Sequence, residues 1–351
     1  MINKHKNKSI TLKIIIGIIF ISNLVFSGQG SAGAKFLQIN NGSHGMANGG
    51  SLIARAGLLE AVYYNPASIA SIKNAQFYAT HIDYYIDLKF EQVSFAYKTP
   101  FGSFSVALFG LLSGEMEETT EEIPTGTGRM FTANDLCGQF SFAKKFTNKF
   151  SGGITAKYIS QSIDKLNSSG LAFDMGALYK TGILNNLVIG FAFRNFGSDM
   201  RYTGENLQQL TSLTDNVFED EDVKIELSSE SYSLPTAFEL GFSMEFSAFI
   251  PGKIITSASL HNIVDQSEYF SFGIEYHYFE YMYFALGHGN MTALINSDLS
   301  DEDLNGNMRG ISGGVGLNLK PVFNKNIWLT YAFEGHKYFN PIHSFGVTIH
   351  L

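Results

Sequence analysis

The chain has 351 residues, a net charge of −8 and 16% charged residues, whereas typical soluble domains have about 25%. The acidic balance, without any basic stripe, excludes a nucleic-acid-binding protein. Aromatic residues reach 14%, dominated by 31 Phe and 17 Tyr, and the charges are too scattered for a helical membrane protein.

The first 32 residues have the features of a secretory signal peptide. Lys4, Lys6, Lys8 and Lys13 form a basic start, and an apolar run follows over 14–26. Small residues come next, so we expect cleavage between residues 27 and 34. No cysteine lies among residues 27–34, directly after the apolar run, so the attachment residue of a lipoprotein is missing there.

Residues 33–74 are predicted to form a plug. The Gly-rich stretch 42–50 shows no sustained strand alternation. Further on, Asn65, Pro66 and Ala67 form a corner, because Pro66 fixes φ, removes a backbone donor and pushes Asn65 towards extended geometry. We interpret this corner as the point where a compact N-terminal piece gives way to a large β structure.

Residues 75–351 predict an all-β fold, a transmembrane antiparallel β-barrel of about 14 strands. Period-2 alternation marks strands at 75–83, 88–98, 102–112, 134–146, 149–163, 169–181, 186–197, 235–247, 253–263, 267–279, 281–289, 309–319, 326–336 and 343–351. Each has room for the ~9–11 residues that a tilted strand needs to cross a bilayer. A large, nearly charge-free face repeats over many strands, which favours contact with lipid over a shared core. Fourteen strands enclose more space than their own side chains fill, so we expect residues 33–74 to lie in the lumen.

The connections between strands alternate in length. The long gaps 113–133, 198–234 and 290–308 all follow odd-numbered strands, and the gaps after even-numbered strands are short. Long outer loops and short periplasmic turns are typical of outer-membrane barrels. The pattern predicts a bacterial outer-membrane protein, with lipid as its surroundings and both termini in the periplasm.

Alternation also predicts which polar side chains face the lumen. Three of them lie on successive strands, where an ion-pair ladder across neighbours is plausible. The set favours a structural network that holds the plug, and a substrate-guiding role is the alternative. Its members are Lys157, Asp174, Arg194, Glu239, Glu275 and Glu334.

Motifs for catalysis, cofactors and metals are missing from the sequence, so we expect a protein that is not an enzyme and needs no cofactor. The nine histidines lack metal-ligand spacing, and Cys137 reads as a small apolar strand residue. Residues 301–306 match the first half of a calcium loop, but its twelfth position is Ser312 instead of Glu. A solvated acidic turn is therefore preferred over a calcium site.

Several segments resemble a known family. Residues 45–50 and 63–70 resemble the N-terminus of PorV/PorQ-type outer-membrane proteins, and further matches lie at 114–128 and 194–201. More distantly the chain is similar to the FadL superfamily, whose plug carries an Asn-Pro-Ala element and whose barrel has fourteen strands. It departs from the pattern at Asn48, which interrupts the glycine run, and at Leu351, where a terminal aromatic is favoured.

The resemblance implies two alternative functions. PorV-like members act in type IX secretion, where they dock substrate proteins or secretion-system subunits, and FadL-like members pass hydrophobic small molecules. We favour docking, because the family-like elements at 114–128 lie in a predicted exterior loop, and keep transport as the alternative. The predicted docking loop consists of Glu115, Glu117, Glu118, Thr119, Thr120, Pro124, Gly126 and Gly128, and a second acidic loop follows over 215–222.

Overall fold

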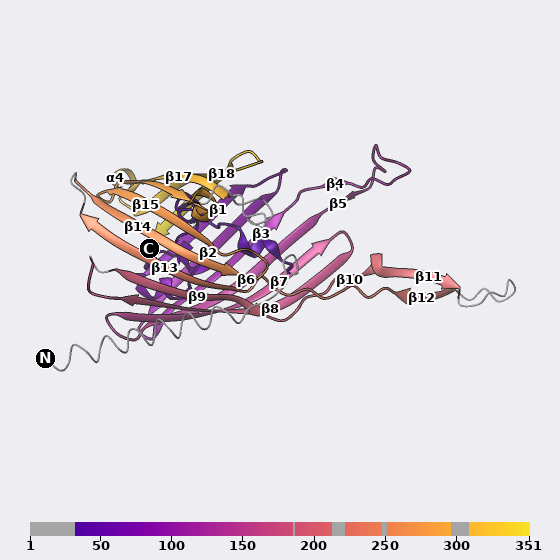
Figure 1. The fold of residues 1–351 in the computed structure, drawn as a ribbon, viewed down its shortest axis with the longest axis horizontal. Helices are drawn as coiled ribbons and strands as arrows, with labels where there is room; N and C mark the ends of the chain where they lie inside the picture. The colour runs from indigo at the N-terminus through magenta and orange to yellow at the C-terminus, as the bar shows by residue number, and fades with distance from the viewer. Residues whose placement is uncertain (1–31, 185–186, 213–221, 248–250, 296–308) are drawn as a thin grey trace.

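The computed structural model describes residues 32–184, 187–212, 222–247, 251–295 and 309–351. Residues 1–31 of the predicted signal peptide lie outside this described part. Fourteen antiparallel strands form one closed barrel, as the alternation predicts (Figure 1). Residues 32–72 run through its interior before the first barrel strand begins.

The barrel strands match the predicted segments closely, and the largest difference is the start of β8, expected at residue 169 and observed at Leu166. They are β1 (Ala75–Asp83), β2 (Lys89–Thr99), β3 (Gly102–Leu112), β6 (Ala133–Lys145), β7 (Phe150–Ile163), β8 (Leu166–Lys180), β9 (Val188–Gly197), β13 (Ala237–Ser247), β14 (Lys253–Ile263), β15 (Tyr269–Tyr278), β16 (Met282–His288), β17 (Arg309–Asn318), β18 (Ile327–His336) and β19 (Ile342–His350). Each pairs with its neighbours along the chain, and β1 closes the barrel against β19, with Phe77 opposite Ile349.

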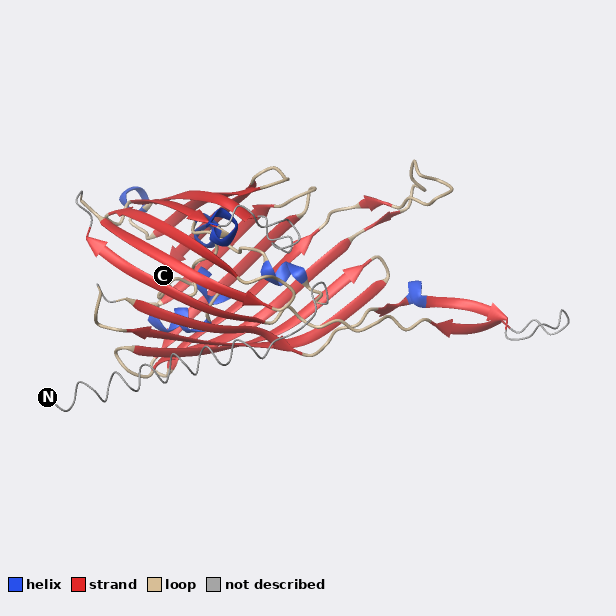
Figure 2. Cartoon of the chain, viewed as in Figure 1, coloured by secondary structure: helices blue, strands red, loops and turns tan. Residues whose placement is uncertain are grey.

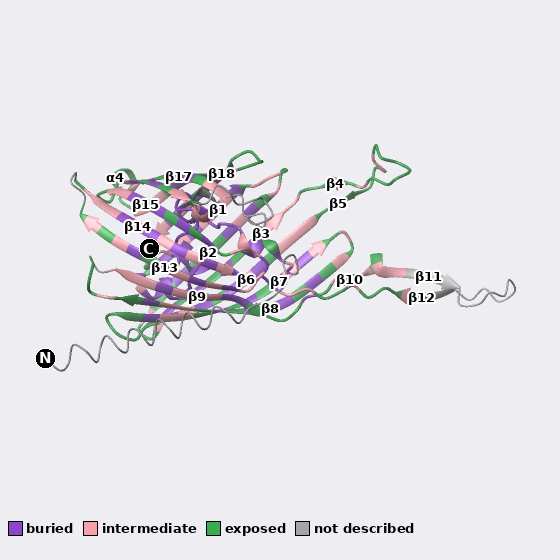
Figure 3. Ribbon diagram, in the orientation of Figure 1, coloured by how far each residue is buried: buried purple, intermediate pink, exposed green. Residues whose placement is uncertain are grey.

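The two faces of the wall differ as the alternation requires. Outward side chains are large and apolar, such as Leu108 and Phe140, which are 59% and 52% exposed to the surroundings. Inward positions on the same strands, such as Ser105 and Ser141, are buried. Buried and exposed residues therefore alternate along each strand in Figure 3. An apolar outer band of this kind suits lipid contact. The backbone also suits a membrane, because each barrel strand is hydrogen-bonded on both edges.

The interior segment, which we call the lumen segment (residues 32–72), is built from short helical turns and extended backbone. These are η1 (Lys35–Gln38), α2 (Ser43–Ala47), η2 (Glu60–Tyr63) and η3 (Pro66–Ser71). The α2 turn lies against β16 to β19, and η3 lies against β3, β6, β7 and β8. Most residues of this segment are buried. It therefore contacts walls on opposite sides of the barrel.

The two ends of the described chain lie at opposite ends of the barrel. Leu351 donates its backbone N–H to the Ala75 carbonyl at the end that carries the short turns. Ala32 instead bridges Ser233 among the long loops, and Lys35 pairs with Asp265 beside it. We expected both termini on the short-turn side; the C-terminal end of the described chain lies there, and the N-terminal residues 1–31 lie outside the described residues. The even number of strands puts the start of β1 and the end of β19 at the same, short-turn end of the barrel. The lumen segment, however, begins at Ala32 among the long loops at the other end.

The long loops carry structure that alternation did not predict. Two arms project from the same end of the barrel, as Figure 2 shows. One is the pair β4 (Met116–Glu117) and β5 (Met130–Phe131). The other holds β10 (Thr203–Gly204), η4 (Glu205–Leu207), β11 (Gln208–Ser212) and β12 (Asp222–Glu226).

Two short helices complete the described elements. They are α3 (Met291–Ile295), after β16, and α4 (Lys320–Phe323), in the turn between β17 and β18. Within the described residues, no helix has the length and apolar character needed to cross a membrane.

Candidate functional site

The Asn-Pro-Ala corner anchors the lumen segment to the barrel wall. Asn65 has extended backbone angles (φ −153°, ψ 113°), as expected before Pro66, and its Oδ1 accepts from the Ala67 N–H at 2.9 Å. Its Nδ2 donates to the carbonyls of Ala177 in β8 and Phe191 in β9, both at 3.2 Å. Asn65 is fully buried, so one side chain joins a helix start to two wall strands.

Glycines on the inner wall make room for this corner. A Cβ on Gly176 would lie 2.0 Å from Asn65 Oδ1, and one on Gly153 would lie 2.6 Å from the Pro66 carbonyl carbon. The two glycines are register partners on β7 and β8. Because no larger residue fits between the wall and the corner, the lumen segment packs directly against the backbone of β7 and β8. Sequence reasoning did not single out these glycines, although each occupies an inward strand position.

Lys157 and Asp174 form a buried ion pair at 2.7 Å between β7 and β8. Asn195 completes the cluster, because its side chain accepts from Lys157 Nζ at 2.7 Å and its N–H donates to Asp174 at 2.8 Å. Asn195 has φ +58°, a left-handed geometry that Asn adopts more readily than most residues. The pairing of β8 with β9 shifts at this level. That irregularity turns Asn195 inward, which strict alternation would not predict.

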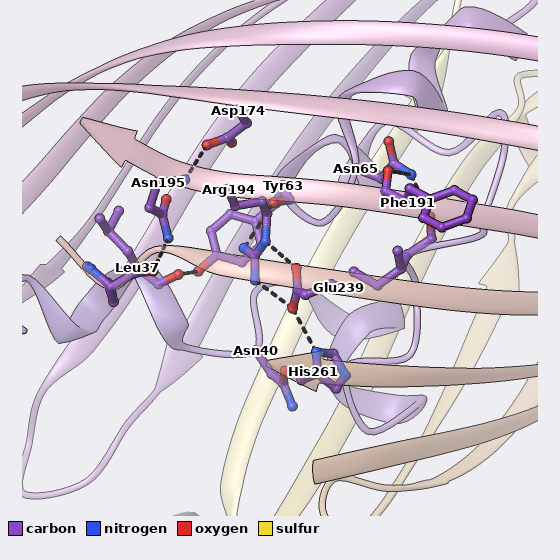
Figure 4. A network of polar contacts seen from close by, with 12 residues as sticks. Leu37, Asn40, Tyr63, Asn65, Asp174, Phe191, Arg194, Asn195, Glu239 and His261 are labelled. Atoms are coloured by element: carbon purple, nitrogen blue, oxygen red, sulfur yellow. Dashed lines mark hydrogen bonds and ion pairs between the residues drawn. The ribbon is translucent and has the colours of Figure 1, made fainter. Parts of the chain in front are cut away.

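Arg194 joins a different partner from the one in the expected ladder. Its guanidinium donates to both carboxylate oxygens of Glu239 on β13, at 2.6 and 3.0 Å (Figure 4). His261 on β14 contacts the same carboxylate at 2.7 Å. Arg194 also donates to the Tyr63 carbonyl of the lumen segment at 3.3 Å. The expected ladder of three residues is thus divided into two buried clusters.

Glu275 and Glu334 each hold the lumen segment from another part of the wall. Glu275 accepts from Asn48 at 2.6 Å and pairs with Arg55 at 2.8 Å. Glu334 accepts from Asn40 at 2.6 Å. All six predicted lumen residues are buried, and every cluster but the one at Lys157 contacts residues 40–63. Arg194, Glu275 and Glu334 thus connect the barrel wall to the inserted segment.

Apolar side chains dominate the lumen near the long loops. An arc of inward residues crosses six strands from β1 to β8, and we call it the apolar arc: Ile82, Phe90, Phe109, Cys137, Ile159 and Ala172. Phe36 of the lumen segment fills the space beside it, with its ring 6.1 Å from that of Phe109. Cys137 is a buried thiol within this arc, in keeping with the small apolar role expected for it.

Glu60 is a carboxyl group buried inside the lumen segment. It accepts from the Gly45 N–H at 2.7 Å, and His44 lies 3.8 Å away. Burial raises the pKa of Glu60 to about 8, against the opposing hydrogen bonds from Gly45 and Tyr78. Burial lowers the pKa of His44 to about 4, so this histidine is neutral at pH 7. The lumen segment therefore contains a protonated acid at neutral pH.

Raising the pH from about 6 to about 9 should loosen the lumen segment. The raised pKa means that the folded state holds a proton that the unfolded state has lost, so this stabilisation is complete below about pH 4.5 and is lost through about pH 8. Hydrogen-exchange protection factors in residues 42–64, which divide out the base-catalysed intrinsic rate, should fall over this range, and Glu60→Gln should remove the fall. Protection factors in the wild-type protein that stay constant from pH 6 to pH 9 would contradict the assignment.

The predicted docking loop is held in a defined shape by its own residues. Glu117 accepts from the Gly128 N–H at 2.9 Å, and Glu118 pairs with Arg129 at 3.1 Å. Gly126 has φ +111°, a backbone conformation that residues with a side chain rarely adopt, so a substitution there would be strained. The remaining predicted residues, Glu115, Thr119, Thr120 and Pro124, are exposed on the loop surface.

Asp164 joins this loop to the second arm. Arg129 donates to both of its oxygens at 2.6 and 2.7 Å, and Asn206 donates at 2.7 Å. The side-chain hydrogen bond from Arg129 lowers the pKa of Asp164. The two arms and the β7–β8 turn are therefore connected through one carboxylate. Of the second acidic loop, residues 215–221 lie outside the described residues.

No group of three or more possible metal ligands occurs among the described residues. The calcium-like stretch 301–306 lies outside them. Sequence reasoning missed the partners that organise the lumen, which are Asn40, Asn48, Arg55, Asn195 and His261. The only available signal was polar residues in a segment predicted to lie inside a barrel.

The fold is similar to those of two solved structures. The toluene transporter TodX of Pseudomonas putida aligns with a TM-score of 0.55 at 12% identity, over 92% of this chain and 98% of that one. A FadL homologue of Pseudomonas aeruginosa aligns with a TM-score of 0.50 at 13% identity, over 88% and 98%. No protein-family model matches the chain, and no curated protein matches its sequence. The chain thus has the fold of the TodX and FadL-homologue barrels.

Proposed function

We propose that this barrel carries hydrophobic small molecules across the outer membrane, with the lumen segment as its plug. The apolar arc carries the proposal, because it lines the lumen beside the long loops where an external molecule would enter. Small-molecule sites are mostly apolar with a few polar groups, and the neighbouring buried clusters supply those groups. The structural neighbour TodX is a toluene transporter, which supports the same class of substrate.

In this proposal Phe36 occupies the place of the substrate in the resting state. Its ring contacts Phe109, which also lies 5.9 Å from the ring of Phe90 in a stacked arrangement. A flat apolar molecule could replace Phe36 against the ring of Phe109. Movement of residues 33–39 would expose the arc, and the wall itself would need no rearrangement.

Uptake of labelled toluene by cells that produce the barrel tests this function. Phe109→Asn places an amide in the arc, which should lower uptake about tenfold, since an unpaired buried amide costs about 1–3 kcal/mol. Thr330→Asn, an inward change on β18 away from the arc, is the matched control and should keep wild-type uptake. The amount of folded barrel in the outer membrane is compared between variants by the change in gel mobility on heating.

Two outcomes would contradict transport. The wild-type barrel could give no more toluene uptake than cells without it. Alternatively, the Phe109 variant could take up toluene at the wild-type rate while it is present at equal level.

Docking of secreted proteins or type IX secretion subunits is the second candidate function. The braced exterior loop favours it, because Glu117 and Glu118 shape the loop and leave Glu121 and Glu122 exposed. A preformed acidic surface selects partners by charge. The PorV-like resemblance of residues 114–128 points to the same role.

Affinity purification from outer membranes tests docking. Glu121→Lys with Glu122→Lys reverses the exposed charge and keeps the internal loop bonds, so partner recovery should fall. Glu91→Lys, which reverses a charge on the outward face of β2, serves as the control. Equal recovery from all three proteins, or no recovered protein, would exclude this role for the loop.

A further inference from the structure

A cavity of about 710 Å³ opens at the short-turn end of the barrel, below the lumen segment. Residues 54–58 of the lumen segment line the cavity on the side of the barrel interior. The short-turn ends of β6, β8, β13 and β14 line one side of it. Trp328 and Tyr283 line the opposite side. The cavity is separate from the apolar arc, which lies at the long-loop end.

Three lysines, Lys145, Lys149 and Lys180, line one side of this cavity. Lys145 at the end of β6 is the register partner of Ser151 in β7. Lys149 lies two residues before Ser151 in the turn that precedes β7, and its carbonyl accepts from the Lys180 N–H at 2.8 Å. Three adjacent chain segments thus place three lysines, all of them exposed, along the short-turn side of the cavity.

These lysines lack acidic partners in the described part of the chain. The other cations of the cavity are neutralised, because Lys253 pairs with Glu245 at 3.0 Å and Arg55 pairs with Glu275 at 2.8 Å. No ion pair within the described residues involves the three lysines. The adjoining turn residues 185–186 and 248–250 contain no acid in their sequence. The cluster is therefore an uncompensated positive site in a chain whose net charge is −8.

We propose that this cavity binds a phosphate-bearing ligand from the short-turn side. Concave walls of one charge sign concentrate counter-ions, and three separate ammonium groups match the spread charge of a phosphate. A planar carboxylate is better served by an arginine fork, and the one arginine of the cavity is held by Glu275. The proposal concerns a second site and does not depend on transport through the lumen.

Trp328 is the only tryptophan in the chain and lines the cavity, so its fluorescence can report binding. Titration of the purified full-length barrel with inorganic pyrophosphate should change the emission saturably, with calorimetry as a second readout. The double variant Lys145→Gln, Lys180→Gln should bind about tenfold more weakly or worse. Lys144→Gln removes the same charge from the neighbouring residue on the outward face and should bind like the wild type.

The phosphate group could belong to a soluble compound or to a lipid headgroup. Detergent micelles containing phosphatidylglycerol test the lipid headgroup. Binding of pyrophosphate alone assigns the site to a soluble phosphate ligand, and binding of the lipid alone assigns it to a headgroup. The proposal is overturned if neither probe binds by either readout. It is also overturned if Lys144→Gln weakens binding as much as the double variant, or if citrate binds as tightly as pyrophosphate.

Discussion

Replacing Gly176 by valine is expected to displace the Asn-Pro-Ala corner of the lumen segment from the wall and to open a conducting path beside it. The new Cβ would lie 2.0 Å from Asn65 Oδ1 and 2.8 Å from Pro66 Cδ, so Asn65 and Pro66 must move away from β8. Overpacking alone costs about 1–3 kcal/mol. The lost hydrogen bonds of Asn65 add about 0.5–1.5 kcal/mol each. Valine suits a strand, so the wall itself should still form.

Single-channel conductance in planar bilayers measures this effect. The wild-type barrel should be closed or nearly so, and the Gly176→Val barrel should conduct steadily. Gly138→Val is the matched control, because a Cβ at Gly138 meets nothing within 4 Å. A Gly176→Val barrel that remains closed would show that the lumen segment tolerates displacement of Asn65 from the wall.

Glu239→Ala is expected to cause a large loss of stability. It would leave the Arg194 guanidinium buried without its bidentate partner and would remove the contact with His261. Breaking one side of a buried ion pair typically costs about 3–5 kcal/mol. Urea unfolding of the barrel in lipid vesicles should show this loss as a lower midpoint with an unchanged slope.

A double variant separates charge from packing in this cluster. Arg194→Met with Glu239→Leu removes both charges and keeps most of the volume, so it should recover most of the lost stability. Glu205→Ala breaks the exposed pair with Lys165 and should leave the unfolding midpoint unchanged. If Glu239→Ala unfolded at the wild-type midpoint, the cluster would not contribute to stability.

Alternation in the sequence alone determined the barrel. All fourteen strands were predictable, because the side chains of a membrane strand face lipid and lumen in turn. Apolar and polar or small residues therefore alternate along the sequence. The end that carries the long loops followed from connection length. The inward positions of residues such as Lys157 and Glu334 followed from the same period.

Only the tertiary structure decided which lumen residues meet and where the lumen segment lies. Partners such as Arg194 and Glu239 are far apart in sequence, and the pairing of Lys157 with Asn195 depends on a local irregularity that breaks the alternation. The lumen segment has no repeat of its own, so its entry among the long loops at Ala32 could not be derived from strand parity. Its path is set by close contacts with wall glycines and buried polar groups, which exist only once the barrel has closed around it.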